Sequence, residues 1–185
     1  MTQIEHRSQK PAPLLVQHLP SLPKGFALDI ASGYGRNAFY LASKGYQVEG
    51  YDRNEEAVAY CNEKAGHQNL PFSAVCADLE IEAPFQERKY NLVSCFYYLD
   101  RRIIPMLKKI LQPGGVIVYE TFLIDQHRQF GRPSRVQFCW DHNELLASFK
   151  DFRILFYHEG MILPQGEGRS GEGTWVAQLI AERKV

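Results

Sequence analysis

Residues 26–42 constrain the fold of this 185-residue chain more strongly than any other stretch. They begin with the short apolar run 26–30, which is typical of a buried parallel strand. The chain then passes through Gly33 and Gly35 and continues with apolar residues that a helix can bury. A strand, a tight glycine turn and a helix in this order bring backbone N–H groups close to a ligand, because glycine has no Cβ in the way. This order predicts an α/β fold with a binding site at the end of the first strand.

Three acids close three successive predicted strands at their C-terminal ends. The strands cover residues 26–30, 47–51 and 72–76, and the acids are Asp29, Asp52 and Asp78. Ligands of open α/β sheets bind at these ends, so three acids there are a stronger signal than any one of them. Asp52 lies 17 residues past Gly35, where an acid accepts hydrogen bonds from both hydroxyls of a ribose. The alternative for Asp52 is a loop acid near the start of a helix that Asn54 caps.

The rest of the chain predicts alternating strands and helices and then a closing pair of strands, hence an open, mostly parallel sheet covered on both faces. Asp100 is the expected cap of a helix that reaches Leu111, and Asp141 is the expected cap of a short helix with Glu144 at its third position. The further predicted strands are residues 90–96, 116–120, 152–157 and 174–181. Two connections are expected, a long irregular loop at 123–140 and a flexible, glycine-rich hairpin connection at 166–173.

Length and charge narrow the possible functions. A chain of this length with 45% hydrophobic residues forms one well-packed domain. Lys+Arg and Asp+Glu both number 21, so no basic excess indicates nucleic acid or an anionic membrane surface as a partner. The four cysteines show neither metal-ligand spacing nor a disulfide framework, and we expect no bound metal. No signal segment and no apolar run of membrane-spanning length are present, so we expect a soluble, cytoplasmic protein whose oligomeric state the sequence does not indicate.

The glycine turn is written D-x-x-x-G-x-G at residues 29–35, and it resembles the first motif of the class I S-adenosylmethionine-dependent methyltransferases. The turn L-x-P-G-G at 111–115 is similar to another recurring turn of that family, and Gly-Arg-Asn at 35–37 to small bacterial methyltransferases of the tellurite-resistance type. The resemblance implies a doubly wound, mostly parallel seven-stranded sheet with a terminal antiparallel strand. It also implies a methyltransferase domain at 26–185, preceded at 1–25 by an extension that is either a lid over the cofactor or a plain strap on the core.

The resemblance further implies S-adenosyl-L-methionine as the cofactor. Asp29 would organise the loop near the amino end of the cofactor's methionine, Asp78 would receive the adenine amino group, and Leu79 would line the adenine ring. Ala31 is a mild departure, since many members have glycine there. The expected cofactor-binding residues are Asp29, Ala31, Gly33, Gly35, Asn37, Asp52, Asp78 and Leu79.

A methyl group on a sulfonium is already a strong electrophile. Such an enzyme therefore acts mainly by holding a small-molecule acceptor in line with the S–CH3 bond and by excluding water. A general base is needed only where the acceptor arrives protonated. The candidate substrate-facing residues are Tyr97, Tyr98, Arg101, Glu120 and His127. The two tyrosines offer aromatic faces to a cation, although strand alternation is expected to turn one of them into the core.

For two of these candidates the sequence leaves two alternative roles. Arg101 either binds an anionic acceptor or pairs with Asp100 or Glu120. His127 is either a base or a surface histidine on a loop. The Asn/Asp-Pro-Pro-Tyr signature of many amino-group methyltransferases is absent at residues 95–98, which argues against methylation of nucleobases or glutamine side chains.

Two other classes of protein remain open. The spacing Gly33-x-Gly35-x-x-Ala38, with Asp52 as a ribose acid, also satisfies a permissive fingerprint of NAD- or flavin-dependent oxidoreductases. Asp29 at the end of the first strand, Asp78 after the third strand and the lack of room for a second catalytic domain argue against that class. The other class is a non-catalytic protein that binds the cofactor and regulates a partner, and methyl transfer to any acceptor would decide against it.

Overall fold

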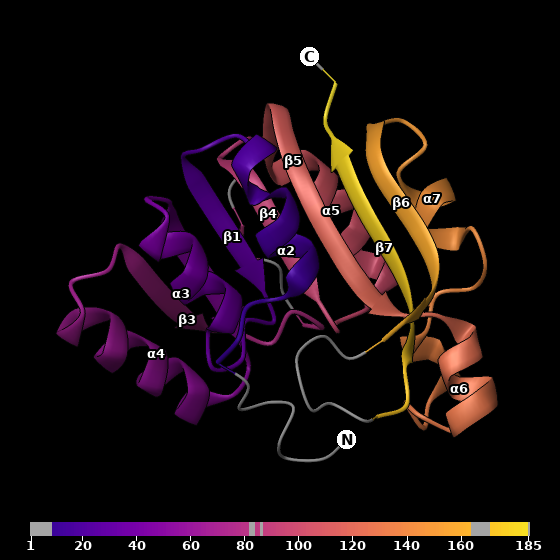
Figure 1. Cartoon of the computed structure of the whole chain (residues 1–185). Helices are drawn as coiled ribbons and strands as arrows, with labels where there is room; N and C mark the ends of the chain where they lie inside the picture. Colours follow the sequence, from indigo (N-terminus) through magenta and orange to yellow (C-terminus); the bar gives the residue numbers. More distant parts are fainter. Residues whose placement is uncertain (1–8, 82–83, 86, 164–170, 185) are drawn as a thin grey trace.

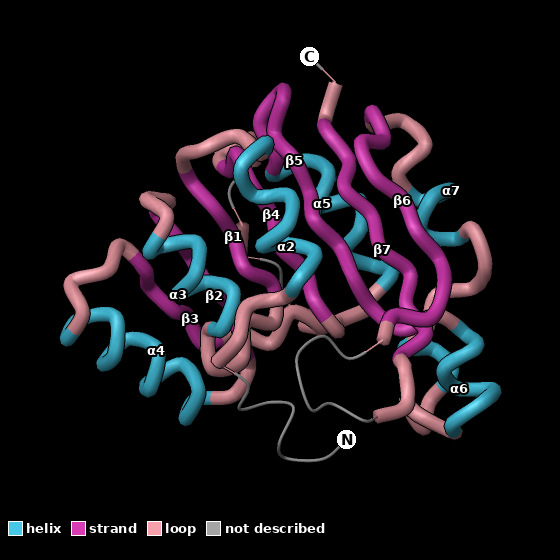
Figure 2. The backbone as a smooth tube through the Cα atoms, in the orientation of Figure 1, coloured by secondary structure: helices cyan, strands magenta, loops and turns pink. Residues whose placement is uncertain are grey.

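The computed structural model describes residues 9–81, 84–85, 87–163 and 171–184 of the chain. They form a seven-stranded sheet with the strand order β3-β2-β1-β4-β5-β7-β6 (Figures 1 and 2). Neighbouring strands from β3 to β5 pair in parallel, whereas β7 runs antiparallel to both β5 and β6. The expected doubly wound sheet with an antiparallel strand is confirmed. The strands are β1 (Phe26–Ile30), β2 (Gln47–Asp52), β3 (Phe72–Cys76), β4 (Tyr90–Phe96), β5 (Leu111–Phe122), β6 (Arg153–Ile162) and β7 (Thr174–Glu182).

Helices cover both faces of the sheet (Figure 1). Helices α2, α3 and α4 lie on one face, α5 and α7 lie on the other, and α6 follows β5 at the edge where the parallel strands end. No helix in the described ranges is long and apolar enough to cross a bilayer. The helices are α2 (Pro13–His18), α3 (Arg36–Ser43), α4 (Glu55–His67), α5 (Ile104–Ile110), α6 (Ile124–Phe130) and α7 (Glu144–Ser148), with 3-10 turns η1 (Leu19–Ser21), η2 (Arg101–Ile103) and η3 (Val136–Phe138).

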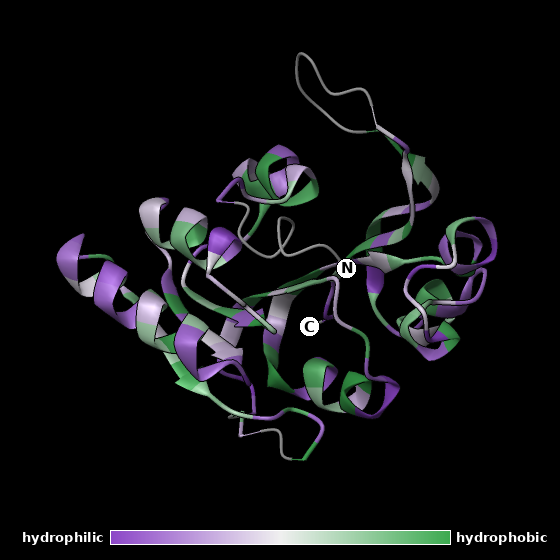
Figure 3. Cartoon of the chain, turned by 90° about the horizontal axis from the view of Figure 1, so that it is seen from below, coloured by the Kyte–Doolittle hydropathy of each residue, from purple (hydrophilic) through white to green (hydrophobic). Residues whose placement is uncertain are grey.

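Each face of the sheet has its own hydrophobic core. Consecutive strand residues point to opposite cores, so Ala27 and Leu92 pack under α2 and α3 while Leu28 and Val93 pack under α5. Burial on both faces is the reason that these strands appear in the sequence as continuous apolar runs. Seen from below in Figure 3, hydrophilic residues lie mainly on the outer sides of the helices.

Local capping signals place two helix starts as predicted. Asn54 Oδ1 accepts a hydrogen bond from Ala57 N–H at 3.2 Å and caps α4. Asp100 Oδ1 accepts from Arg102 N–H at 2.9 Å and caps the turn η2, which continues directly into α5. Both helices thus carry an oxygen acceptor for the N–H groups that a first turn leaves unpaired.

Two expectations about helices are wrong. Leu111 belongs to β5 and not to the preceding helix, because its backbone is extended (φ −69°, ψ 139°) and it pairs with Tyr90 of β4. Residues 123–140 are not irregular, because they contain α6 and η3. Helix α6 lacks a side-chain N-cap, and Gln126 Oε1 accepts from Trp175 N–H at 2.8 Å, so a contact distant in sequence holds it.

Three further boundaries differ from expectation. The capping box at Asp141 forms only in part: Glu144 Oε2 accepts from Asp141 N–H at 2.9 Å, but the residue at the N-cap of α7 is Asn143, with a left-handed φ of 62°. The strands β5 and β6 are longer than predicted. The expected hairpin connection at 166–173 lies largely outside the described residues.

Candidate functional site

The loop between β1 and α3 combines an open glycine with a tightly packed one. Ala31, Gly33 and Gly35 all have left-handed φ values, of 51°, 52° and 76°. A Cβ at Gly35 would lie 2.9 Å from Cys61 Sγ and 3.0 Å from the Phe39 ring, so this glycine is packed against protein. A Cβ at Gly33 would meet nothing within 4 Å. The backbone at Gly33 therefore borders open space, where a ligand can approach it.

Asp29 is buried near the end of β1, with 2% of its surface exposed. Ser94 Oγ–H donates to Asp29 Oδ1 at 2.6 Å. Burial raises the pKa of Asp29 to about 7, while the hydrogen bond from Ser94 and the positive charge of Arg36 act in the opposite direction. An ammonium group placed beside this acid would favour its carboxylate form.

Asp29→Asn should change how stability depends on pH. The pKa of Asp29 is about 7 in the folded chain against 3.8 for an unperturbed aspartate, so the folded state binds the proton more tightly. Stability therefore falls as pH rises between these two values, and above them a buried carboxylate costs on the order of 4 kcal/mol. We expect urea unfolding to show the variant more stable than the wild type at pH 8, with the advantage lost at low pH. A stability difference that does not vary with pH would contradict this role of burial.

Asp52 joins the glycine loop to β2. Its Oδ2 accepts from Gly33 N–H at 2.7 Å, and its Oδ1 accepts from Asn54 N–H at 2.9 Å. Each carboxylate oxygen retains capacity for a further donor, so Asp52 can hold the loop and two ribose hydroxyls together. In the same loop, Ser32 Oγ is buried without a hydrogen-bond partner in the described part of the chain. A buried polar atom of this kind is a group that a ligand can satisfy.

The remaining predicted cofactor residues lie in different surroundings. Asp78 follows β3 and accepts from Glu80 N–H at 3.0 Å, and Leu79 is buried in the core under α5. Asn37 is 3% exposed, and its Oδ1 accepts from Ala12 N–H at 2.9 Å. The side-chain carbonyl of Asn37 therefore anchors the N-terminal segment, a contact that no local pattern in the sequence indicates.

The two tyrosines after β4 pack toward opposite faces of the sheet, and both are half-buried. Tyr97 contacts the core under α2 and α3, and Tyr98 contacts the core under α5. The φ of Tyr97 is 57°, which is unusual for a bulky residue. Its ring lies 5.1 Å from the Phe122 ring, and the Arg36 guanidinium lies 5.7 Å from its centroid. Strand alternation thus separates the tyrosines between two cores, not between core and solvent.

Glu120 is a buried acid of β5, with 2% of its surface exposed. Gln178 Nε2 donates to its Oε2 at 2.7 Å, and the Tyr97 side chain also hydrogen-bonds to it. Burial raises the pKa of Glu120, while these two hydrogen bonds and the nearby Arg36 act in the opposite direction. Glu120 and Tyr97 therefore form one cluster on the α2–α3 side of the sheet.

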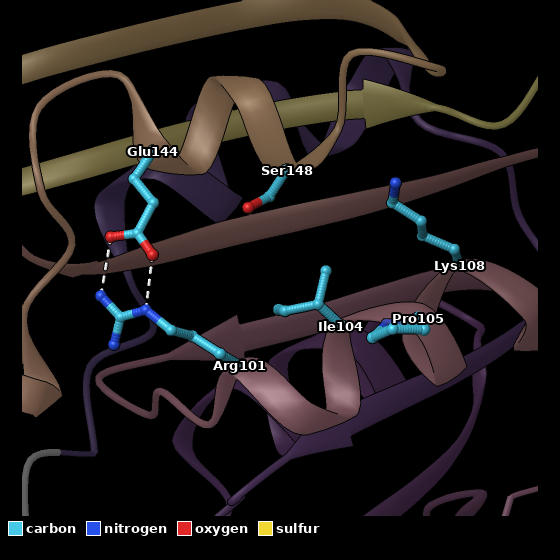
Figure 4. A pocket seen from close by; sticks show the side chains of 6 residues that line it. All are labelled: Arg101, Ile104, Pro105, Lys108, Glu144 and Ser148. Carbon is cyan, nitrogen blue, oxygen red and sulfur yellow. Dashed lines mark hydrogen bonds and ion pairs between the residues drawn. The ribbon is translucent and has the colours of Figure 1, made fainter.

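Arg101 braces the segment that connects α6 and α7 (Figure 4). Its guanidinium donates to both carboxylate oxygens of Glu144, at 2.5 and 2.7 Å. It also donates to the carbonyl oxygens of Gln137 and Cys139, each at 2.9 Å, and lies 5.1 Å from the centroid of the Trp140 ring.

Neither partner expected from the sequence binds Arg101. Asp100 pairs with Arg102 at 2.7 Å, and Glu120 lies on the opposite side of the sheet. His127 lies in α6 and not on a loop, and its Nδ1–H donates to the Pro133 carbonyl at 2.8 Å. The structure therefore brings together only Tyr97 and Glu120 among the five substrate-facing candidates.

Arg101→Ala should lower stability and leave binding of S-adenosyl-L-methionine unchanged. The side chain of Arg101 is 41% exposed, so we expect the lost bonds to cost about 2 kcal/mol, and not the larger value of a buried pair. That loss corresponds to a fall in melting temperature of roughly 5 °C, measurable by differential scanning fluorimetry. Arg102→Ala, at a more exposed guanidinium, is the control. Weakened ligand binding with unchanged stability would instead assign Arg101 to the cofactor site.

Three acids lie around the glycine loop at one edge of the sheet. A buried acid lies at β1, an acid with free acceptor capacity at β2 and a third acid after β3, around a loop with open backbone at Gly33. The sheet has the fold of the class I S-adenosylmethionine-dependent methyltransferases. Within that class the chain belongs to the TehB family, because the sequence profile of the family described as Tellurite resistance protein TehB matches residues 16–167.

Known relatives support the assignment of the chain to this family. A protein of Haemophilus influenzae (strain 10810) named "Probable S-adenosyl-L-methionine-dependent methyltransferase TehB" is 33% identical over 141 residues, which are 72% of this chain and 48% of the relative. The crystal structure of TehB from Haemophilus influenzae is similar with a TM-score of 0.75 and 28% identity, over 92% of this chain and 61% of that one. A Methanosarcina mazei protein of the same fold gives a TM-score of 0.71 at 19% identity, over 95% of this chain and 99% of that one. The chain spans about half the length of the curated relatives it matches.

Proposed function

We propose that this chain transfers a methyl group from S-adenosyl-L-methionine to a small-molecule acceptor. The observation that carries the proposal is the convergence of Asp29, Asp52 and Asp78 at one edge of the sheet, around the open backbone of Gly33. The names of the two Haemophilus influenzae relatives support it.

Each acid has a separate role in this proposal. Asp29 pairs with the ammonium group of the cofactor, Asp52 accepts from its ribose hydroxyls, and Asp78 accepts from its adenine amino group. The cofactor, when bound, supplies a methyl group on a sulfonium that needs no further activation. The remaining task of the chain is to hold an acceptor in line with that methyl group and to keep water away.

The order of the strands indicates where the acceptor binds. Strands β2 and β3, which carry the ribose and adenine acids, lie on one side of β1. The neighbours of β1 on the other side are β4 and then β5, where Tyr97 and Glu120 lie. We place the acceptor at the ends of β4 and β5.

We further propose that the N-terminal segment contributes to this site. The hydrogen bond from Ala12 N–H to Asn37 joins the segment to the first turn of α3, two residues after Gly35. Helix α2 buries Leu14 and Leu15 in the core that α3 also covers. A segment fixed in this way can restrain the glycine loop while a ligand is bound.

Calorimetric titration with S-adenosyl-L-methionine, S-adenosylhomocysteine and NADH, in parallel, tests the proposed cofactor. We expect binding of both adenosyl ligands and none of NADH. Binding of NADH alone would contradict the proposal and would favour an oxidoreductase. Binding of the adenosyl ligands with no methyl transfer to any of a broad set of acceptors would favour a regulatory role.

A further inference from the structure

The guanidinium of Arg36 lies near two buried acids at the edge of the sheet that carries the proposed cofactor site. Arg36 is half-buried and is the first residue of α3, directly after Gly35. Its positive charge acts on both Asp29 and Glu120 and opposes the rise in pKa that burial causes in each. The guanidinium also lies 5.7 Å from the centroid of the Tyr97 ring. These neighbours place a cation beside the glycine loop, where no sequence motif had indicated one.

The Arg36 guanidinium has unused hydrogen-bonding capacity. A guanidinium carries five N–H donors. Among the described residues that of Arg36 makes neither a hydrogen bond nor an ion pair, and it contacts the face of the Tyr97 ring. Arg101 differs, because its guanidinium donates to Glu144 and to two backbone carbonyls. A half-buried arginine without an acceptor is a group that an anionic ligand can satisfy.

The backbone beside Arg36 also favours an anion. Helix α3 begins here, and its N-cap, Gly35, has no side chain to accept from the free N–H groups of the first turn. These groups carry a partial positive charge. The neighbouring backbone at Gly33 borders open space, as described above. Arg36 therefore adds a full positive charge to a region that a ligand can approach.

The methionine end of the cofactor carries two opposite charges close together. Its ammonium nitrogen and its carboxylate carbon are bonded to the same carbon atom and are therefore only about 2.5 Å apart. An ammonium group beside Asp29 brings the carboxylate near Asp29 as well, where the two anions repel each other unless a cation is at hand. Arg36 is the cation whose charge acts on Asp29.

We propose that Arg36 binds the carboxylate of the cofactor's methionine and selects ligands with an intact amino-acid end, an inference that rests on the function proposed above. Two N–H groups of the guanidinium can donate to the two carboxylate oxygens in parallel. Asp29 then holds the ammonium group and Arg36 the carboxylate. With both charges held, the methionine chain keeps one direction, and the sulfonium stays aimed at the ends of β4 and β5.

An anionic acceptor is the other ligand that Arg36 can bind. The position of Arg36 favours the cofactor, because Arg36 directly follows the glycine loop and its charge acts on Asp29. An acceptor that occupied the guanidinium would leave the cofactor's carboxylate beside Asp29 without a counter-charge. The experiment below separates these two ligands.

Calorimetry with S-adenosyl-L-methionine and decarboxylated S-adenosylmethionine tests the inference. The second ligand lacks only the carboxylate and retains the ammonium group, the sulfonium and the adenosine. We expect the wild type to prefer the first ligand about 100-fold and Arg36→Met to lose this preference. Arg36→Lys should keep a preference of about tenfold, because a lysine ammonium supplies the charge without the paired geometry. Arg102→Met, at an exposed guanidinium of η2, is the matched control and should behave as the wild type.

The preference is a ratio of two affinities of the same variant, so a general weakening of the site does not imitate the expected result. Melting temperatures check that each variant is folded, and Arg36→Lys keeps the test decisive if Arg36→Met is not. A wild type that binds both ligands equally, or an unchanged preference in the Arg36 variants, would overturn the inference. An unchanged preference together with poorer methylation of anionic than of neutral acceptors would assign Arg36 to the acceptor. A wild type that binds neither ligand would instead contradict the proposed function itself.

Discussion

Asp52→Ala should bind S-adenosyl-L-methionine about 100-fold more weakly than the wild type. The substitution removes a carboxylate that, in the proposed complex, accepts hydrogen bonds from two ribose hydroxyls, and each bond to a charged group contributes roughly 1.5–3 kcal/mol. It also removes the bond from Gly33 N–H, which positions the open part of the glycine loop. A loss of about 2.7 kcal/mol in binding corresponds to the expected 100-fold change. Calorimetric titration measures it directly.

The control for this experiment is Glu63→Ala, an exposed acid on α4. We expect the control to bind the cofactor as the wild type does. Urea unfolding of Asp52→Ala should show a stability loss of about 1–2 kcal/mol, since two backbone N–H groups lose an acceptor. Unchanged affinity in Asp52→Ala would rule out the ribose role and would leave Asp52 as a loop acid that caps its own turn.

Alanine substitutions at the two loop glycines should separate packing from ligand binding. At Gly35 the added methyl group meets Cys61 and Phe39, and the φ of 76° strains any L-residue, so we expect a stability loss of about 3 kcal/mol. At Gly33 only the backbone strain applies, and we expect a loss of about 1 kcal/mol. Urea unfolding compares the two variants.

Binding of S-adenosyl-L-methionine then distinguishes the open space at Gly33 from an unused part of the surface. We expect Gly33→Ala to weaken binding at least tenfold, because its methyl group enters the space that the cofactor occupies in our proposal. A tenfold loss corresponds to about 1.4 kcal/mol of binding free energy. Wild-type affinity in Gly33→Ala would show that the cofactor does not pass this backbone. A stability loss of only about 1 kcal/mol in the urea experiment would show that the variant is folded, so that a binding defect does not reflect unfolding.

The strands and their order along the chain were predictable from sequence because each is a local signal. Buried parallel strands are apolar on both faces, and glycine, proline and capping residues mark the ends of neighbouring elements. The acids Asp29, Asp52 and Asp78 were predictable for the same reason, since parallel strands joined by helices bring their carboxyl ends to one edge. Ala31, where many family members have glycine, has a left-handed φ of 51°.

The partners of several side chains were not predictable. Arg101 binds Glu144, which is 43 residues away, and not the adjacent Asp100. Gln178 is 58 residues from Glu120 and has no motif around it, yet its Nε2 donates to Glu120 Oε2. Asn37 was expected to contact the cofactor, and no local pattern in the sequence indicates that its Oδ1 accepts a hydrogen bond from Ala12 N–H.

Whether a feature was predictable from the sequence depends on how far apart in the chain the interacting residues lie. The sequence by itself establishes the strand–glycine turn–helix unit and the acids at the strand ends, because backbone preferences and capping act within a few residues. Only the tertiary structure decides that Arg101 braces the segment between α6 and α7, and that Glu120 contacts both Gln178 and Tyr97. The contact between Glu120 and Gln178, for example, depends on the pairing of β5 with β7, because the register between strands far apart in the chain sets which side chains share a face.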